Sequence, residues 1–356
     1  MDNKISRTKP QIFDVQDLVR PNVKKMKPYS SARDEFKEIG ANMVFIDANE
    51  NPFETGLNRY PDPHQRELKQ LISNIKKFPE SQILLGNGSD EVLDLLFRAF
   101  CEPKQDNIII LPPTYGMYKV LAELNDVQYK SVLLTDDFQL KVSRILDTAD
   151  EFSKLLFICS PNNPSGNCFK KNDIEDLLQN FKGIVVIDEA YVDFTGEDSW
   201  IQRLNEFPNL VVCQTLSKAY GLAGIRLGMC FASEDIINIL KKIKPPYNVN
   251  QLTQQKAKEI IGENNVGEDI QLILKGRKKL LEDLDQINFV RKIYPTDANF
   301  VLVKVDDANK RYVQLVESGV VVRNRSNQEL CDNCLRLTVG TPDENEKLIN
   351  KLKELL

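Results

Sequence analysis

One lysine of the chain lies in an unusual setting. Lys218 belongs to the segment 211–232, VVCQTLSKAYGLAGIRLGMCFA, in which two apolar runs that indicate buried strands flank a loop of small residues. Thr215 and Ser217 precede the lysine, and Arg226 follows it. A solvated loop lysine would explain Lys218 by itself. A lysine amine can also form a Schiff base with a carbonyl compound and move protons, so the loop is a candidate catalytic loop.

A glycine-containing turn follows the apolar run 83–85. This turn, GNGSDE, opens a helical pattern, so that Gly88, Ser89 and Asp90 come at the beginning of a helix. Free backbone amides and the positive end of the helix dipole would suit a phosphate group there. The turn is therefore a candidate phosphate site, although an ordinary turn between a strand and a helix has the same composition.

Two further apolar runs end in residues that could bind a ligand. SPNNPSG follows the run 155–159 and places Asn163 in an extended turn held by two prolines, which by itself also fits a plain turn. The run 184–187 is followed directly by Asp188, with Tyr191 three residues later. An unpaired carboxylate in such a partly desolvated place is unfavourable or takes up a proton. Asp188 therefore needs a cationic partner.

The order of elements predicts an α/β fold. From about residue 83 to 245, apolar runs alternate with amphipathic helical patterns, as in a mainly parallel, doubly wound sheet. Most of the runs are continuously apolar, which indicates strands that are covered on both faces. In open sheets of this kind, ligands bind outside the carboxyl ends of the strands, where the candidate residues lie.

The sequence changes in character near residue 245. Pro245 and Pro246 end a helical pattern, and a long charged helical region, short strands and a last helix follow. We expect a large domain over 45–245 and a smaller α+β domain over 246–356. The N-terminal segment 1–44 is polar and interrupted by prolines, and we expect it to pack with the small domain.

The composition argues against several partners and sites. A net charge of -5 gives no electrostatic reason to expect nucleic acid or an anionic membrane. The sequence shows neither an apolar run long enough to span a membrane nor a signal peptide, so we expect a cytoplasmic protein. Seven cysteines, an odd number, are typical of reduced thiols. Cys331 and Cys334 form one C-x-x-C pair, but His64 is the single histidine, so we expect no metal site.

The candidate residues together indicate pyridoxal phosphate (PLP) as the cofactor. Lys218 would form a Schiff base with it and later move the proton. Asp188 would pair with the protonated pyridine nitrogen and keep the ring an electron sink, while Tyr191 and Asn163 would hydrogen-bond the ring hydroxyl. The anionic group of the cofactor would be bound by Thr215, Ser217 and Arg226.

Nearly the whole chain resembles the fold-type I aminotransferases. VIDEAYVDF, SPNNPSG and TLSKAYGLAGIRLG are similar to motifs of the wider superfamily, whereas RPNV, MKPY and the late VVVR are closer to the histidinol-phosphate aminotransferase family. Ser165 stands where many relatives have threonine, which keeps the hydroxyl. The resemblance implies transamination between L-histidinol phosphate and 2-oxoglutarate in L-histidine biosynthesis, giving imidazole acetol phosphate and L-glutamate.

The resemblance also implies roles for individual residues. Lys218 would be the catalytic residue, and Tyr115 would stack on the cofactor ring. Tyr60 would reach the cofactor phosphate of the opposite subunit, which implies a homodimer. The cofactor phosphate would be surrounded by Gly88, Ser89, Asp90, Thr215, Ser217 and Arg226.

Substrate binding is implied for Tyr29, Asn163, Arg323 and Arg336. Arg336, in LRLTVG, stands at the motif whose arginine clamps an α-carboxylate in most aminotransferases. Histidinol phosphate has no α-carboxylate, but glutamate does. Arg336, Arg323 and Tyr29 would bind either the substrate phosphate or the glutamate carboxylates. A surface ion pair would also explain Arg323, and ordinary packing would also explain Tyr29.

Three other interpretations remain open. The chain could be a related PLP enzyme that acts on another amine, such as an aromatic aminotransferase or a threonine-phosphate decarboxylase. It could be a catalytically idle aminotransferase-like module, although it retains Lys218, Asp188 and Tyr191 and contains no additional DNA-binding domain. It could also bind phosphate without PLP.

Overall fold

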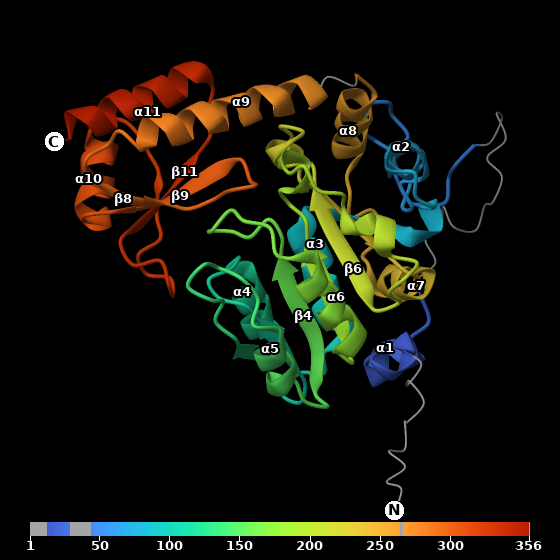
Figure 1. Ribbon diagram of the computed structural model, residues 1–356. Helices are drawn as coiled ribbons and strands as arrows, with labels where there is room; N and C mark the ends of the chain where they lie inside the picture. The colour runs from blue at the N-terminus through green and yellow to red at the C-terminus, as the bar shows by residue number, and fades with distance from the viewer. Residues whose placement is uncertain (1–12, 29–43, 264–265, 356) are drawn as a thin grey trace, which may run out of the picture.

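The computed structural model describes residues 13–28, 44–263 and 266–355 (Figure 1). A seven-stranded sheet lies at the centre of the larger part, in the order β1-β7-β6-β5-β4-β2-β3. Strands β2 to β6 run parallel to one another, and β7 runs antiparallel to its neighbours β1 and β6. The strands are β1 (Ile83–Asn87), β2 (Asn107–Ile110), β3 (Gln128–Ser131), β4 (Ser153–Cys159), β5 (Ile184–Asp188), β6 (Leu210–Thr215) and β7 (Leu227–Ala232).

Helices cover both faces of this sheet, which confirms the predicted α/β fold. One face is covered by α3 (Ser89–Phe100), α4 (Met117–Leu124) and α7 (Glu234–Ile243). The other is covered by α2 (Arg66–Lys76), α5 (Val142–Thr148), α6 (Lys171–Asn180) and α8 (Gln251–Glu263). Alternate residues of every strand except β3 enter the two cores: Phe157 of β4 belongs to the first and Leu156 to the second. Burial on both faces explains why the strand sequences are continuously apolar.

The sequence did not predict β3. Its residues, QYKS, are polar and partly exposed, because β3 lies at the edge of the sheet and pairs with β2 alone. Short 3₁₀ helices occur at Val15–Asp17, Glu80–Gln82, Val192–Phe194, Trp200–Arg203 and Ala223–Ile225.

A second, four-stranded antiparallel sheet has a core of its own (Figure 1). Its order is β10-β11-β9-β8, and α9, α10 and α11 pack on it. Its elements are β8 (Val290–Ile293), β9 (Phe300–Val305), β10 (Arg323–Asn324), β11 (Cys334–Thr338), α9 (Val266–Leu284), α10 (Ala308–Glu317) and α11 (Pro342–Glu354). The predicted domain limits, 45–245 and 246–356, stay a prediction. Ala257 and Ile261 of α8 belong to a core of the large sheet although they follow residue 245.

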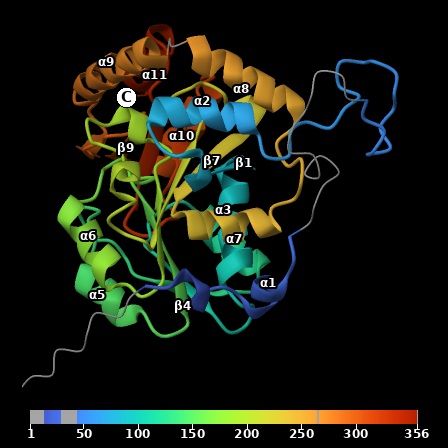
Figure 2. The same ribbon diagram turned by 90° about the vertical axis from the view of Figure 1, so that its right-hand side faces the viewer.

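Residues 13–28 pack on the large sheet's helices. Helix α1 (Pro21–Lys25) lies beside α7 (Figure 2), and the Lys242 amine donates to the Val23 carbonyl at 2.7 Å. Val15, Val19 and Val23 share a core with α3. All three valines are buried against these helices. For this part of the N-terminal segment, the predicted packing with the small domain is therefore wrong.

The part of the chain that the structure describes has no helix long and apolar enough to cross a membrane.

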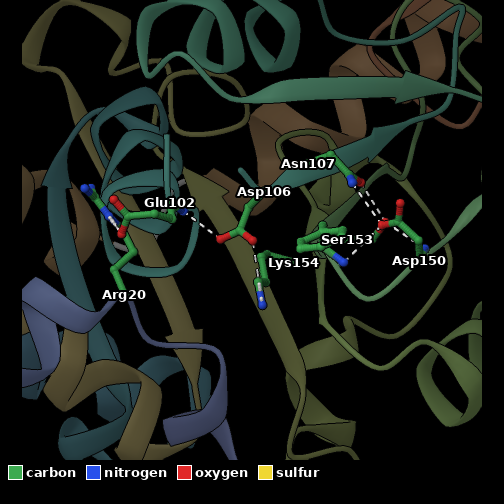
Figure 3. Close-up of polar contacts among 8 residues, drawn as sticks. Arg20, Glu102, Asp106, Asn107, Asp150, Ser153 and Lys154 are labelled. Atoms are coloured by element: carbon green, nitrogen blue, oxygen red, sulfur yellow. Dashed lines mark hydrogen bonds and ion pairs between the residues drawn. The ribbon is translucent and has the colours of Figure 1, made fainter. Parts of the chain in front are cut away.

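A polar network joins the amino-terminal ends of β2 and β4 (Figure 3). Asn107 Nδ2 donates to Asp150 Oδ1 at 2.9 Å, and Ser153 Oγ donates to Asn107 Oδ1 at 2.6 Å. Lys130 Nζ donates to Asp150 Oδ2 at 2.6 Å. The hydrogen bonds from Lys130 and Asn107 hold the pKa of Asp150 well below its usual range. The candidate ligand-binding residues follow the opposite ends of the strands, so this network stabilises the sheet away from them.

Replacing Asp150 by alanine should lower the free energy of unfolding by about 1 kcal/mol, because Asn107 and Lys130 lose an acceptor at a partly exposed site. Because the pKa of Asp150 is depressed in the folded state, its carboxylate stabilises the protein at neutral pH. This stabilisation is lost as the pH falls through the folded-state pKa of Asp150. Urea unfolding should therefore show a difference from wild type at pH 7 that shrinks at pH 3. Asp147→Ala, at an exposed position, is the control. An equal difference at both pH values would contradict the prediction.

Candidate active site

A cavity of about 140 Å³ lies at the carboxyl ends of the parallel strands. Its walls come from the beginning of α3, the segments that follow β4 and β5, and the loop between β6 and β7. Predicted site residues line most of it: Ser89, Asp90, Tyr115, Asn163, Asp188, Tyr191, Thr215, Ser217, Lys218 and Arg226. The fold thus brings together residues that are up to 137 positions apart, counted from Ser89 to Arg226.

Lys218 is accessible from this cavity. Its Nζ lies 5.7 Å from the centre of the Tyr191 ring. Partial burial and the nearby Arg336 lower the pKa of the Lys218 amine. A lower pKa raises the fraction of neutral amine at a given pH, and the neutral amine is the nucleophile.

The beginning of α3 forms a cradle with the loop after β6. Gly88 has a φ of +77°, and a Cβ built on it would lie 2.6 Å from Arg226 Nη2. Gly228 passes so close to α3 that its Cβ would lie 2.2 Å from the Ser89 amide nitrogen. Thr215 Oγ1 donates to Ser217 Oγ at 3.0 Å. Glycine is required at both positions, and the amides, hydroxyls and guanidinium gathered here fit a phosphate group.

Asp188 ends β5 and is only 3% exposed. Tyr118 donates its hydroxyl to Asp188 Oδ2 at 2.8 Å, and the Ala190 amide donates to Oδ1 at 3.2 Å. Burial raises the pKa of Asp188 to about 6. Within the described ranges, no lysine or arginine forms an ion pair with Asp188. A protonated pyridine nitrogen would therefore fit this carboxylate.

Asn163 connects the cavity with the small sheet. Arg336 Nη1 of β11 donates to Asn163 Oδ1 at 2.5 Å, and Asn163 Nδ2 donates to the Tyr191 hydroxyl at 3.4 Å. Burial and the neighbouring Arg325 lower the pKa of Arg336 to about 10. An arginine from the second sheet is thus fixed beside the residues that would meet a cofactor ring.

Tyr118 belongs to the site but was missed by the sequence reasoning. It is fully buried in α4, where its ring stacks on Phe157 at 4.7 Å and meets Tyr115 edge to face at 5.6 Å. Tyr115 itself donates its hydroxyl to Asp90 Oδ1 at 3.1 Å. The signal was present in PTYGMY, where Tyr118 follows Tyr115 closely, at the beginning of a helix.

Two further predicted residues, Arg323 and Tyr60, are not among those that line the cavity. Arg323 is exposed on β10, directly opposite Arg336 of β11. Tyr60 stacks on Tyr247, with ring centres 4.5 Å apart, beside a different cavity of about 490 Å³. Tyr29 lies outside the described residues.

The sequence is similar to known aminotransferases over most of its length. The family model of aminotransferase class I and II matches residues 44–352. The histidinol-phosphate aminotransferase of Flavobacterium johnsoniae is 60% identical over 345 residues, which cover 96% of this chain and 99% of that protein.

Solved structures share the fold. The histidinol-phosphate aminotransferase from Clostridium acetobutylicum has a TM-score of 0.78 and 27% identity, covering 84% of this chain and 91% of that one. L-threonine-O-3-phosphate decarboxylase from Porphyromonas gingivalis has a TM-score of 0.70 and 22% identity, covering 83% and 93%, and is therefore similar in fold alone. By sequence and by fold, the chain belongs to the class I and II aminotransferases and, within them, to the histidinol-phosphate aminotransferase family.

Proposed function

We propose that this chain catalyses PLP-dependent transamination between L-histidinol phosphate and 2-oxoglutarate in L-histidine biosynthesis. The observation that supports this most is one cavity that combines the Lys218 amine, the buried Asp188 carboxylate and a cradle fit for phosphate. The names of the relatives support the choice of substrates. We also propose a cytoplasmic location, where the seven free cysteines stay reduced.

Residues of the cavity would each meet one part of PLP. The amides of Ser89 and Asp90 and the Arg226 guanidinium would bind its phosphate, and Tyr115 would lie against its ring. Tyr191 and Asn163 would hydrogen-bond the ring oxygen. When bound, PLP supplies an electron sink that stabilises negative charge at the substrate carbon that loses its proton.

Asp188 and Tyr118 would act at the ring nitrogen. The Asp188 carboxylate would accept a hydrogen bond from the protonated nitrogen and keep the proton there. Tyr118 is a positioning residue, because its hydroxyl holds Asp188 Oδ2 at 2.8 Å and favours the charged carboxylate over the neutral acid.

Lys218 would be the covalent attachment point of the cofactor and the group that moves the proton. Its amine is accessible from the cavity and has a lowered pKa, so it can accept a proton from the substrate carbon and return it. Arg336 would orient the bound substrate by its anionic group.

The test is a donor panel with the purified holoenzyme. Histidinol phosphate, phenylalanine and threonine phosphate are each supplied with 2-oxoglutarate, and glutamate formation is measured. Histidinol phosphate should be the preferred donor. Preference for phenylalanine, or carbon dioxide release from threonine phosphate without glutamate, would replace the proposal with one of the related PLP enzymes.

Lys218→Ala should lower turnover by about 10⁴-fold or more, because both the covalent link and the proton transfer are lost. The variant should still bind PLP, more weakly and non-covalently. Borohydride treatment followed by mass spectrometry should fix PLP to the wild-type chain and not to the variant. Lys182→Ala, at an exposed position, is the matched control. Turnover that survives in Lys218→Ala would refute the assignment.

Asp188→Asn should separate stability from activity. Burial raises the Asp188 pKa to about 6, so the free energy of unfolding of the cofactor-free protein falls as the pH rises from about 4 to 6. The asparagine side chain of the variant does not ionise, so the variant does not show this fall. At pH 7.5 the cofactor-free variant should exceed wild type by about 2–3 kcal/mol in free energy of unfolding, while holoenzyme activity falls at least about 100-fold. Urea unfolding at pH 4.5 and 7.5 tests this, and a pH-independent difference would contradict it.

We further propose a homodimer in which Tyr60 reaches the partner's cofactor phosphate. The segment around Tyr60, in the blue loop that projects from the molecule in Figure 2, exposes large apolar side chains. Ile46 is 92% exposed, Phe53 78% and Tyr60 52%. Exposed apolar side chains gathered in one region favour a protein interface.

Mixing two inactive variants tests this arrangement. If Tyr60 acts across the interface, a heterodimer of Lys218→Ala and Tyr60→Ala subunits contains one site with both residues. Random exchange of subunits should then restore about a quarter of wild-type activity. Each variant alone should stay nearly inactive. A mixture no more active than its components would refute the crossing of Tyr60.

A further inference from the structure

Glu189 is a buried carboxylate beside the site, and the proposed mechanism does not use it. It directly follows Asp188 and is only 2% exposed. Because alternate residues of a strand point to opposite faces, Asp188 lines the cavity whereas Glu189 points away from it. Burial raises the pKa of Glu189, and hydrogen bonds to its carboxylate oppose that rise. Burying a carboxylate is costly unless such bonds satisfy it, so its partners indicate what it does.

Three hydrogen bonds hold this carboxylate, and they come from two segments of the chain. The Trp200 amide donates to Glu189 Oε1 at 2.7 Å, and Ser199 Oγ donates to Oε2 at 2.5 Å. Gln214 Nε2 of β6 donates to Oε2 at 2.8 Å and also lies 3.2 Å from Ser199 Oγ. Hydrogen bonds to a charged acceptor are stronger than those between neutral groups. Glu189 thus joins the end of β5 to β6 and to the 3₁₀ helix Trp200–Arg203.

The bond between Glu189 and Gln214 lies next to residues that would bind PLP. In the parallel pairing of β5 with β6, Asp188 lies opposite Cys213, and the Glu189 amide donates to the Cys213 carbonyl at 2.8 Å. The side-chain bond continues this pairing by one residue. Thr215, directly after Gln214, lines the cavity together with Asp188. A bond behind the cavity wall therefore joins the two strand ends whose neighbouring residues face inward.

PLP requires a fixed spacing because it is a rigid, flat molecule. Asp188 would meet its ring nitrogen, whereas Thr215 and the loop of Lys218 would meet its phosphate and its reactive carbon. A displacement of about 1 Å between such groups can lower a rate about 100-fold. Building on the function proposed above, we propose that Glu189 is a positioning residue that holds Asp188 at the distance from the Lys218 loop that bound PLP requires.

Glu189→Gln tests this role, with PLP affinity as a readout that does not depend on turnover. The substitution keeps the size of the side chain but replaces one acceptor oxygen by an amide donor, which then faces another donor. The dissociation constant of PLP should rise about 10-fold or more, measured by titrating the cofactor-free protein and following the visible absorption of bound PLP. In the holoenzyme, kcat with histidinol phosphate should fall about 10- to 100-fold, with KM within about 3-fold of wild type.

An exchange variant separates positioning from general damage. In Glu189→Gln/Gln214→Glu the amide and the carboxylate change places, so the bond between the strand ends can form again, and the Trp200 amide and Ser199 Oγ keep acceptors. PLP affinity and kcat should return to within about 5-fold of wild type. Asp150→Ala, which loses hydrogen bonds at the opposite ends of the strands, is the matched control and should change neither quantity.

Gln214→Leu removes only the bond between the two strands and replaces Glu189→Gln in the test if that variant does not fold. It should weaken PLP binding about 5-fold or more. The proposal is overturned if the variant tested leaves PLP affinity within about twofold of wild type, if the exchange variant does not recover, or if Asp150→Ala shows the same losses. Failure of wild type to transaminate histidinol phosphate would instead refute the proposed function, while PLP affinity still decides the role of Glu189.

Discussion

The burial of one carboxylate at the end of the central strand is the constraint on which the site depends. Asp188 ends β5, which has three strands on each side, and its charge is removed from water. Hydrogen bonds from the Tyr118 hydroxyl and the Ala190 amide compensate only in part for this loss of hydration. Tyr118 must in turn be held in α4 by stacking on Phe157 of β4. The position of α4 beside β4 thus provides a hydrogen bond that this carboxylate requires, and the protonated nitrogen of PLP would supply the missing charge.

A second constraint fixes the two sheets relative to each other. Two hydrogen bonds join the segment after β4 to Asp297, which precedes β9 of the small sheet. The Asp297 amide donates to the Gly166 carbonyl at 2.7 Å, and the Cys168 amide donates to Asp297 Oδ2 at 2.8 Å. Arg277 of α9 adds a hydrogen bond to the Phe194 carbonyl, in the 3₁₀ helix after β5, at 3.3 Å. These contacts set the position of Arg336 beside Asn163. The loop after β4 therefore contributes Asn163 to the cavity and at the same time contacts Arg336 of the small sheet.

The errors of the sequence reasoning have physical causes. Strand β3 lacks an apolar run because it has a single neighbour in the sheet. The sequence does not tell which surface buries the valines of residues 13–28, and helices α3 and α7 do so.

The sequence by itself determined the alternation of strands and helices, the parallel sheet, and the polar residues that follow each strand, because periodicity and strand ends are local properties of the chain. It also singled out Lys218 and Asp188, which line one cavity, since a lysine among small residues and an aspartate after a buried strand are unusual wherever they occur. Only the tertiary structure decided that Tyr118 holds Asp188, that Arg336 meets Asn163, and which residues of β10 and β11 lie opposite each other. The first two contacts join residues 70 and 173 positions apart, and the pairing of β10 with β11 depends on strand register. Contacts over such separations and the register of strands are not encoded in any local stretch of sequence.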